Sequence, residues 1–156
     1  MSAILFTSFA LFALYIILIV EKNRGVPQSI SDSFYLKGVG YTFTIWCFAI
    51  GFSVAMVMFD ASAGRWFQFL GLFAGGGLCF VGTAPYFKSH ERTVHFTSAA
   101  TCAVAAAAWM CAAGYAPALI PVLIVALAVR QNRMFWSEIT IFLMTYTSLY
   151  LHLNQV

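Results

Sequence analysis

Long apolar runs with almost no charge dominate this sequence, and they constrain the fold more than any other feature. The chain has 156 residues, of which 62% are hydrophobic and only 8% are charged. Soluble domains carry roughly 25% charged residues and present a polar surface to water. Eight basic and five acidic residues are too few to cover such a surface. The composition therefore excludes a soluble enzyme, a nucleic-acid-binding protein and a disordered chain, and it indicates an integral membrane protein.

Six stretches meet the requirement for a transmembrane helix, which is about 20 mostly apolar residues. They lie at about residues 3–20, 39–59, 66–87, 93–113, 116–130 and 135–153. The sequence predicts an all-α fold, a polytopic helical bundle with six transmembrane helices and short loops, as one domain over residues 1–156. The fifth stretch is short, because about 12 apolar residues cover only ~18 Å of a ~30 Å bilayer core. It must recruit turn residues, thin the bilayer or form a broken segment.

The basic residues are distributed unevenly between the predicted loops. The first, third and fifth loops contain Lys22, Arg24, Lys37, Lys88, Arg92, Arg130 and Arg133. Arg65 is the one basic residue on the other side. Basic residues of short loops concentrate on the cytoplasmic side of a membrane. The sequence therefore predicts a multi-pass protein of the inner cell membrane, with both termini on the non-cytoplasmic side.

Small residues concentrate in the third and fourth predicted helices. Gly71 and Gly75 are four residues apart, Gly76 and Gly77 follow, and residues 99–113 are rich in alanine. Helices in lipid associate through close packing of small residues, so these two helices are predicted to form the centre of the bundle. The same pattern leaves open a self-association face that makes a homo-oligomer, and a local helix break at residues 75–77.

Polar side chains gather near one predicted membrane face, where the second, fourth and sixth helices begin. Asp32 precedes the second helix, and His95 and Glu138 lie just inside the fourth and sixth. Ionisable groups in membrane segments are functional hypotheses by default. Helix capping and interfacial hydrogen bonding are the structural alternative, because Ser31 or Asp32 can cap a segment and Glu138 suits a helix N-terminus.

Three functional interpretations use this cluster. A lipid-headgroup site takes phosphate partners from the loops and hydrogen bonds from His95 and a serine; its candidates are Lys88, Arg92, Arg130, Arg133 and Ser29. A hydrolase takes a serine nucleophile, a base and an orienting acid; its candidates are Ser31, His95 and Asp32. A zinc site takes imidazoles and carboxylates with one open position; its candidates are His95, Asp32, Glu138 and His90.

Two short motifs resemble those of an uncharacterised bacterial polytopic membrane family. Ile30-Ser31-Asp32 follows the first predicted helix, and Gly82-Thr83-Ala84-Pro85 ends the third and precedes His95. Their order is similar to that in the damage-regulated autophagy modulator (DRAM) superfamily of eukaryotic six-span proteins. The resemblance covers the first four helices. It implies a six-helix bundle in which Asp32 and His95 belong to one site, and a role in handling membrane lipid.

The sequence thus predicts a small membrane protein that binds or organises lipid and has no soluble catalytic domain. A membrane-embedded lipid hydrolase centred on His95 and Asp32 is the enzymatic alternative, and an oligomeric channel or membrane effector is the third. Membrane lipids are the predicted partners, with a homo-oligomer as a further option and no nucleic acid. The sequence requires no cofactor.

Overall fold

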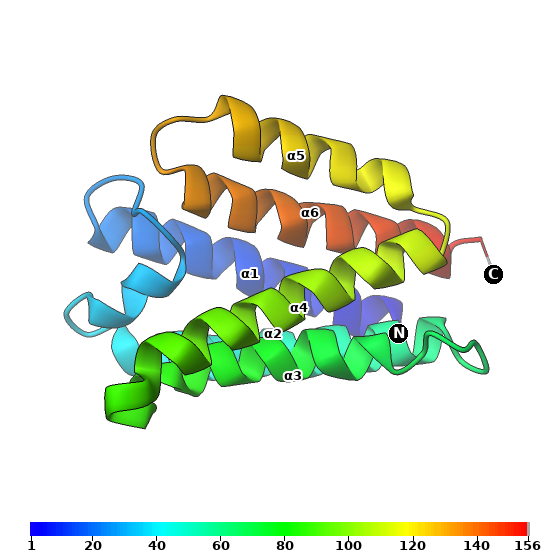
Figure 1. Cartoon of the computed structure of the whole chain (residues 1–156), viewed down its shortest axis with the longest axis horizontal. Helices are drawn as coiled ribbons and strands as arrows, with labels where there is room; N and C mark the ends of the chain where they lie inside the picture. Colours follow the sequence, from blue (N-terminus) through cyan, green and yellow to red (C-terminus); the bar gives the residue numbers. More distant parts are fainter. Residues whose placement is uncertain (156) are drawn as a thin grey trace.

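The structure, a computed structural model, describes residues 1–155 as a bundle of α-helices joined by short connections (Figure 1). The helices are α1 (Ser2–Lys22), α2 (Gly40–Ala61), α3 (Leu70–Thr83), α4 (Glu91–Ala112), α5 (Leu119–Ala128) and α6 (Arg133–Leu153). Short 3-10 segments precede α2, α4 and α5: η1 (Ser31–Tyr35), η2 (Ala84–His90) and η3 (Ala116–Ala118). Residues 1–155 contain no strand, which confirms the predicted all-α class.

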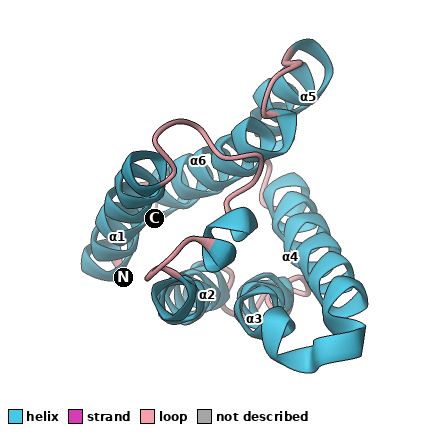
Figure 2. Ribbon diagram, turned by 90° about the vertical axis from the view of Figure 1, so that its left-hand side faces the viewer, coloured by secondary structure: helices cyan, strands magenta, loops and turns pink. Residues whose placement is uncertain are grey.

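Five of these helices surround a common interior, and the remaining helix, α5, lies outside them. Seen along the bundle, α1, α2, α3, α4 and α6 form a ring, and α5 lies against the outside of α6 (Figure 2). The core comes from the ring helices, whereas α5 contributes no buried residue. The N-terminus and the end of α6 lie at the same end of the bundle (Figure 1). The connections that precede α2, α4 and α6 lie together at the opposite end, as the predicted topology requires.

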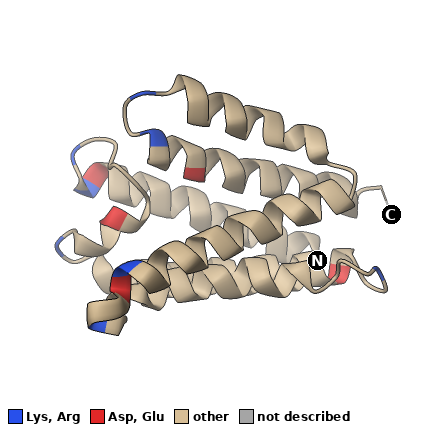
Figure 3. Ribbon diagram, viewed as in Figure 1, with Lys and Arg blue, Asp and Glu red and all other residues tan. Residues whose placement is uncertain are grey.

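The Lys, Arg, Asp and Glu residues lie toward the two ends of the bundle, and its long middle carries none of them (Figure 3). The outside of that middle carries large apolar side chains that are more than half exposed: Phe6, Leu14, Ile17, Ile45, Phe52, Leu72, Phe73, Phe80, Val104, Leu123 and Leu127. A soluble protein rarely exposes so much contiguous apolar surface. An apolar belt between two charged ends is the surface that a bilayer solvates. The exterior therefore agrees with membrane localisation.

Three segments of residues 1–155 are long and apolar enough to cross a membrane, which does not support the predicted set of six. They are Ser2–Lys22, Gly40–Ala61 and the stretch Leu70–Ala112, which contains both α3 and α4. The fifth helix is shorter than the predicted range of 116–130, because α5 has only ten residues and is about 15 Å long. Pro117 and Pro121 explain its late and irregular start, because proline lacks the N–H that continues a helix. Helix α6, with 21 residues, is long enough to cross a membrane, but its Thr, Ser, Tyr and His side chains lower its mean hydropathy, and it is not among the three segments.

The third helix begins later and ends earlier than the predicted range of 66–87, because α3 covers Leu70–Thr83. Residues 66–69 form turns, so α3 begins at Leu70 rather than at Trp66. Residues 84–90 belong to η2, where Lys88 has a φ of 50° and breaks the helical path before α4. Pro85 removes a backbone donor at this point. The break separates α3 from α4, whose first turn contains both Glu91 and Arg92.

Glycines let α3 approach its two neighbours closely. A Cβ on Gly75 would lie 2.2 Å from the Gly51 carbonyl oxygen of α2, and one on Gly82 would lie 2.5 Å from the Cys47 Cβ. A Cβ on Gly77 would lie 2.8 Å from the Cys102 nitrogen of α4. The predicted close packing around α3 is therefore present. The local helix break that the sequence left open at residues 75–77 is not present, because α3 is continuous there. Gly75 faces α2, so it is not available for self-association.

Candidate functional site

The segment between α1 and α2 folds into a hydrogen-bonded turn around Asp32. The backbone N–H of Ser29 donates to Oδ2 of Asp32 over 3.0 Å, and the backbone N–H of Asp32 donates to Oγ of Ser29 over 3.2 Å. This reciprocal pair has the pattern of a capping box at the start of η1. Oγ of Ser29 also lies 3.0 Å from Oγ of Ser31. The Asp32 carboxylate is thus already engaged by its own loop.

The same segment is attached to the start of α6. The backbone N–H of the buried Ile30 donates to Oε2 of Glu138 over 2.6 Å. The Phe135 N–H donates to the Gln28 carbonyl over 3.0 Å, and Nδ2 of Asn132 donates to the Val26 carbonyl over 3.1 Å. Three bonds between residues more than 100 positions apart fix this loop across the bundle end. Glu138 therefore joins the first loop to the sixth helix.

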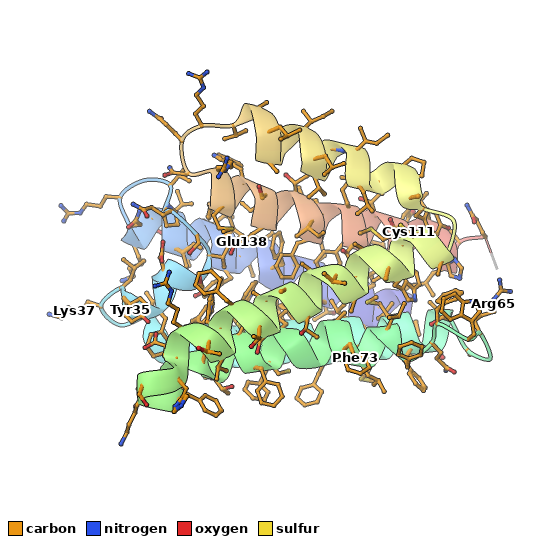
Figure 4. All side chains as sticks on the ribbon, viewed as in Figure 1. Tyr35, Lys37, Arg65, Phe73, Cys111 and Glu138 are labelled. Carbon is orange, nitrogen blue, oxygen red and sulfur yellow. The ribbon has the colours of Figure 1, made fainter. Side chains whose placement is uncertain are left out.

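Two tyrosines connect η1 to the helices beside it. The hydroxyl groups of Tyr15 on α1 and the buried Ser33 lie 2.6 Å apart. The Tyr35 hydroxyl donates to Oε1 of Glu91 at the start of α4. Tyr35 lies at the same end of the bundle as Glu138 and Lys37, whereas Arg65 and Cys111 lie at the other end (Figure 4). The first loop is therefore held by α1, α4 and α6 together.

A pocket of about 600 Å³ opens at this end, and we call it the polar pocket. Its polar lining consists of Ser29, Ser31, Asp32, Tyr35, Lys88, Ser89, Glu91, Arg92, His95 and Glu138. Two of these side chains are cationic and three are acidic, so the pocket offers partners to both an anionic and a cationic group. Glu91 is paired with Tyr35 and Asp32 with Ser29, which leaves Lys88 and Arg92 as the main partners for an anion.

A second cavity of about 120 Å³ lies inside the ring, and we call it the apolar cavity. It is lined mainly by apolar residues of α2, α3, α4 and α6. An apolar cavity of roughly 150 Å³ is large enough to bind benzene. This cavity therefore has room for a short stretch of hydrocarbon.

The two cavities are adjacent, because five residues line both of them. These residues are Ser31, Phe43, His95, Ala99 and Glu138, and we call them the neck. His95 comes from α4 and Glu138 from α6, and both side chains are half-buried. The neck therefore lies between the polar pocket at the bundle end and the mainly apolar cavity inside the ring.

Trp46 lines the apolar cavity and has one unusual property. Its side chain is 6% exposed, and its indole Nε1 has no hydrogen-bond partner. By contrast, Nε1 of Trp109 at the other end of the bundle donates to Oγ of Ser62 over 3.2 Å. Buried polar groups almost always find a partner. Trp46 is the one exception among buried side-chain nitrogen and oxygen atoms in residues 1–155.

The polar pocket brings together most of the residues that the sequence singled out. Ser29, Ser31, Asp32, Lys88, Arg92, His95 and Glu138 all line it. Asp32 and His95 thus share one pocket, although no hydrogen bond joins them directly in the described chain. His90, Arg130 and Arg133 do not line it. His90 instead lies beside Ser89, with its Nδ1 3.1 Å from that hydroxyl oxygen.

The arrangement gives little support to the catalytic and metal interpretations. Within residues 1–155, no group of three or more His, Cys, Asp or Glu side chains is placed to hold a metal ion. No hydrogen bond links Ser31 to His95 in that part of the chain, and Ser31 instead contacts Ser29. A serine nucleophile is activated by a base within hydrogen-bond reach.

Comparisons with protein-family models, with curated proteins and with solved structures find no match to this chain. The resemblance to the bacterial family and to the DRAM superfamily therefore stays a prediction.

Proposed function

We propose that this protein is a multi-pass membrane protein that binds a phospholipid at the bundle end formed by the first, third and fifth connections. The observation that carries this proposal is the neck, through which the polar pocket adjoins the apolar cavity. A phospholipid has the same two parts, a charged headgroup and a hydrocarbon chain. The headgroup phosphate would meet Lys88 and Arg92, and part of one acyl chain would enter the apolar cavity.

Two basic side chains of the pocket, Lys88 and Arg92, supply partners for a phosphate, beside the acidic Asp32, Glu91 and Glu138. Lys88 belongs to η2 and Arg92 to the first turn of α4, and both residues line the pocket. Arginine binds phosphate through several N–H groups at once, and lysine adds a point charge. Ser29, Ser31 and Ser89 offer hydroxyl donors around them. Basic residues that lie between or beside membrane helices are known to bind lipid headgroups.

We also propose that all six helical segments lie within the bilayer, with α5 penetrating it only partly. Two features support this proposal. The middle of the bundle is uncharged, and α1, α2, α4 and α6 run side by side, each with more than 20 residues. The bundle end with the polar pocket carries almost all the basic residues, so it would face the cytoplasm.

Lipid retention tests the binding site. We expect the double variant Lys88→Ala, Arg92→Ala to retain at least about 10-fold less phospholipid than wild type after purification in detergent, because each basic residue contributes about 1 kcal/mol to anionic lipid binding. Native mass spectrometry and lipid extraction measure the retained lipid. The double variant Arg130→Ala, Arg133→Ala is the matched control: it removes the same charge from the same end of the bundle but outside the pocket. Equal loss in both variants, or no bound phospholipid in wild type, would overturn the proposal.

Cysteine accessibility tests the orientation. In a Cys111→Ala background, a membrane-impermeant maleimide added to intact cells should label Ser2→Cys and leave Gln131→Cys unlabelled. Permeabilised cells should label both, which shows that both thiols are reactive. The expectation rests on the basic residues gathered at the end that contains Gln131. Labelling of both positions from the outside would contradict the proposed topology.

A further inference from the structure

The helices around the apolar cavity do not cover it equally. All of its lining residues on α2 and α3 are buried. On α4, the lining residues before Ala106 are not: His95 is half-buried and Ala103 is exposed. On α6, the lining residues before Thr145 are only half-buried, and Ile141 is one of them. This contrast indicates that α2 and α3 close the cavity on one side and that its accessible side lies between α4 and α6.

Helices α4 and α6 approach each other at the end of the bundle away from the polar pocket. There Trp109 of α4 is fully buried, with its ring 5.6 Å from that of His152 of α6. The Tyr115 hydroxyl, just after α4, donates to Oε1 of Gln155 over 3.0 Å. Toward the polar pocket, α4 runs obliquely away from α6 (Figure 1). The accessible side of the cavity therefore widens toward the polar pocket.

We call this accessible side the lateral opening, bounded by residues 95–103 of α4 and 138–142 of α6. In the part of the chain that the structure describes, no hydrogen bond crosses it. The polar pocket lies at its wide end, because His95 and Glu138 line that pocket as well, from the same two helices. A headgroup in the polar pocket and a hydrocarbon chain in the apolar cavity would therefore lie along one continuous side of the bundle.

The size of the apolar cavity requires an exit for the rest of a bound lipid. Its volume of about 120 Å³ is below the roughly 150 Å³ of a cavity that binds benzene, and a phospholipid acyl chain is much longer than benzene. Most of the lipid must therefore lie outside the cavity. Since α2 and α3 close the opposite side, the lateral opening is the route by which hydrocarbon can reach the bilayer.

Resting on the phospholipid binding proposed above, we propose that the lipid enters sideways from the bilayer through the lateral opening. Its phosphate meets Lys88 and Arg92, part of one acyl chain occupies the apolar cavity, and the second chain stays in the bilayer. The ligand is thus a two-chain lipid taken directly from the membrane, and it does not pass through water. The small side chain of Ala103 keeps the route open at the edge of α4.

A bulky side chain at the edge of the opening tests this route. Delipidated protein is reconstituted into phosphatidylcholine vesicles that contain deuterated phosphatidylglycerol and is then extracted in mild detergent. Native mass spectrometry measures the phosphatidylglycerol that each protein retains. Ala103→Trp should retain at least about 10-fold less than wild type, because the added ring fills space that the lipid needs.

Val104→Trp is the matched control, because Val104 is the next residue of α4, is 67% exposed and lines neither cavity. It should retain as much phosphatidylglycerol as wild type. If Ala103→Trp retains as much as wild type, phospholipid binding stands and the sideways route is refuted. Equal loss in both variants would also overturn the route. If wild type itself retains none, the proposed function fails.

A second measurement uses wild type alone, so it does not depend on the folding of a variant. Phosphatidylglycerol with a photoreactive diazirine in its acyl chains is bound in vesicles, the protein is extracted, and the retained lipid is cross-linked by light. Peptide mass spectrometry should find the cross-links on α4 and α6 at the lateral opening, in residues 95–106 and 138–145. Cross-links that avoid both helices would place the chains elsewhere and overturn the inference, while phospholipid binding would stand.

Discussion

Replacing Gly75 by alanine should destabilise the bundle by about 3 kcal/mol or more, at the upper end of the range for overpacking a tight core. The new Cβ would lie 2.2 Å from the Gly51 carbonyl oxygen and 2.6 Å from the Ala55 Cβ. Neither atom belongs to the mobile end of a side chain, so α2 and α3 must separate along their length. Close packing is the main attraction between helices in lipid, and this separation would remove it. Thermal unfolding in detergent, followed by circular dichroism and size exclusion, measures the effect.

Gly76→Ala provides the matched control on the adjacent residue of the same helix. A Cβ at Gly76 would have no neighbour within 4 Å, and alanine favours a helix over glycine by up to about 1 kcal/mol. This variant should therefore be as stable as wild type or slightly more stable. A similar stability for Gly75→Ala and Gly76→Ala would show that α2 and α3 do not pack as closely as the structure indicates.

The sequence predicted the helical class and most helix positions because apolar runs and charged breaks are strong signals. The first, second, fourth and sixth predicted helices begin and end within about three residues of α1, α2, α4 and α6. The ends of α3 were missed because Trp66–Phe69 is largely apolar yet folds as turns. The glycine pattern predicted close approach around α3. It did not identify α2 as the partner of Gly75, because a sequence pattern does not say which helix lies opposite.

The candidate site was predictable in position but not in its contacts. Topology alone places Asp32, His95 and Glu138 at one end of the bundle, and they line one pocket. The spacing of Ser29 and Asp32 matches a capping box, so their reciprocal bonds could have been inferred. Arg130 and Arg133 share that end but do not line the pocket; Arg130 follows α5, which lies outside the ring, and Arg133 begins α6. The partnership of Glu138 with Ile30 joins residues 108 positions apart and left no signal in the sequence.

Trp46 was missed although the sequence contained a signal for it. Tryptophans of membrane proteins usually lie at the interfaces, where the indole N–H reaches water or lipid headgroups. Trp46 lies six residues inside α2, so its N–H requires a partner within the bundle. A tryptophan at such a depth raises the question of what accepts its hydrogen bond. Only the three-dimensional contacts show that the protein supplies no acceptor in the described residues.

Glu138→Ala should lower the free energy of unfolding by about 3 kcal/mol, because it removes the carboxyl acceptor and leaves the buried Ile30 N–H without a partner. The first loop would keep its bonds to Asn132 and Phe135 but lose the contact at its buried end. We therefore expect faster hydrogen exchange and faster proteolysis at residues 26–32, with α2 and α4 protected as in wild type. Thermal unfolding in detergent and hydrogen-exchange mass spectrometry measure both effects.

Glu138→Gln distinguishes the hydrogen bond from the charge. The amide oxygen can still accept from Ile30, so this variant should stay within about 1 kcal/mol of wild type, or exceed it, because a neutral amide is less costly to bury than a carboxylate. Glu21→Ala is the control for loss of an acidic residue at the same end, since Glu21 is exposed. If Glu138→Ala and Glu138→Gln lose equal stability, the carboxylate charge rather than the bond to Ile30 holds the loop. If neither loses stability, Glu138 does not fasten the first loop to α6, and its place in the neck must be explained by the ligand alone.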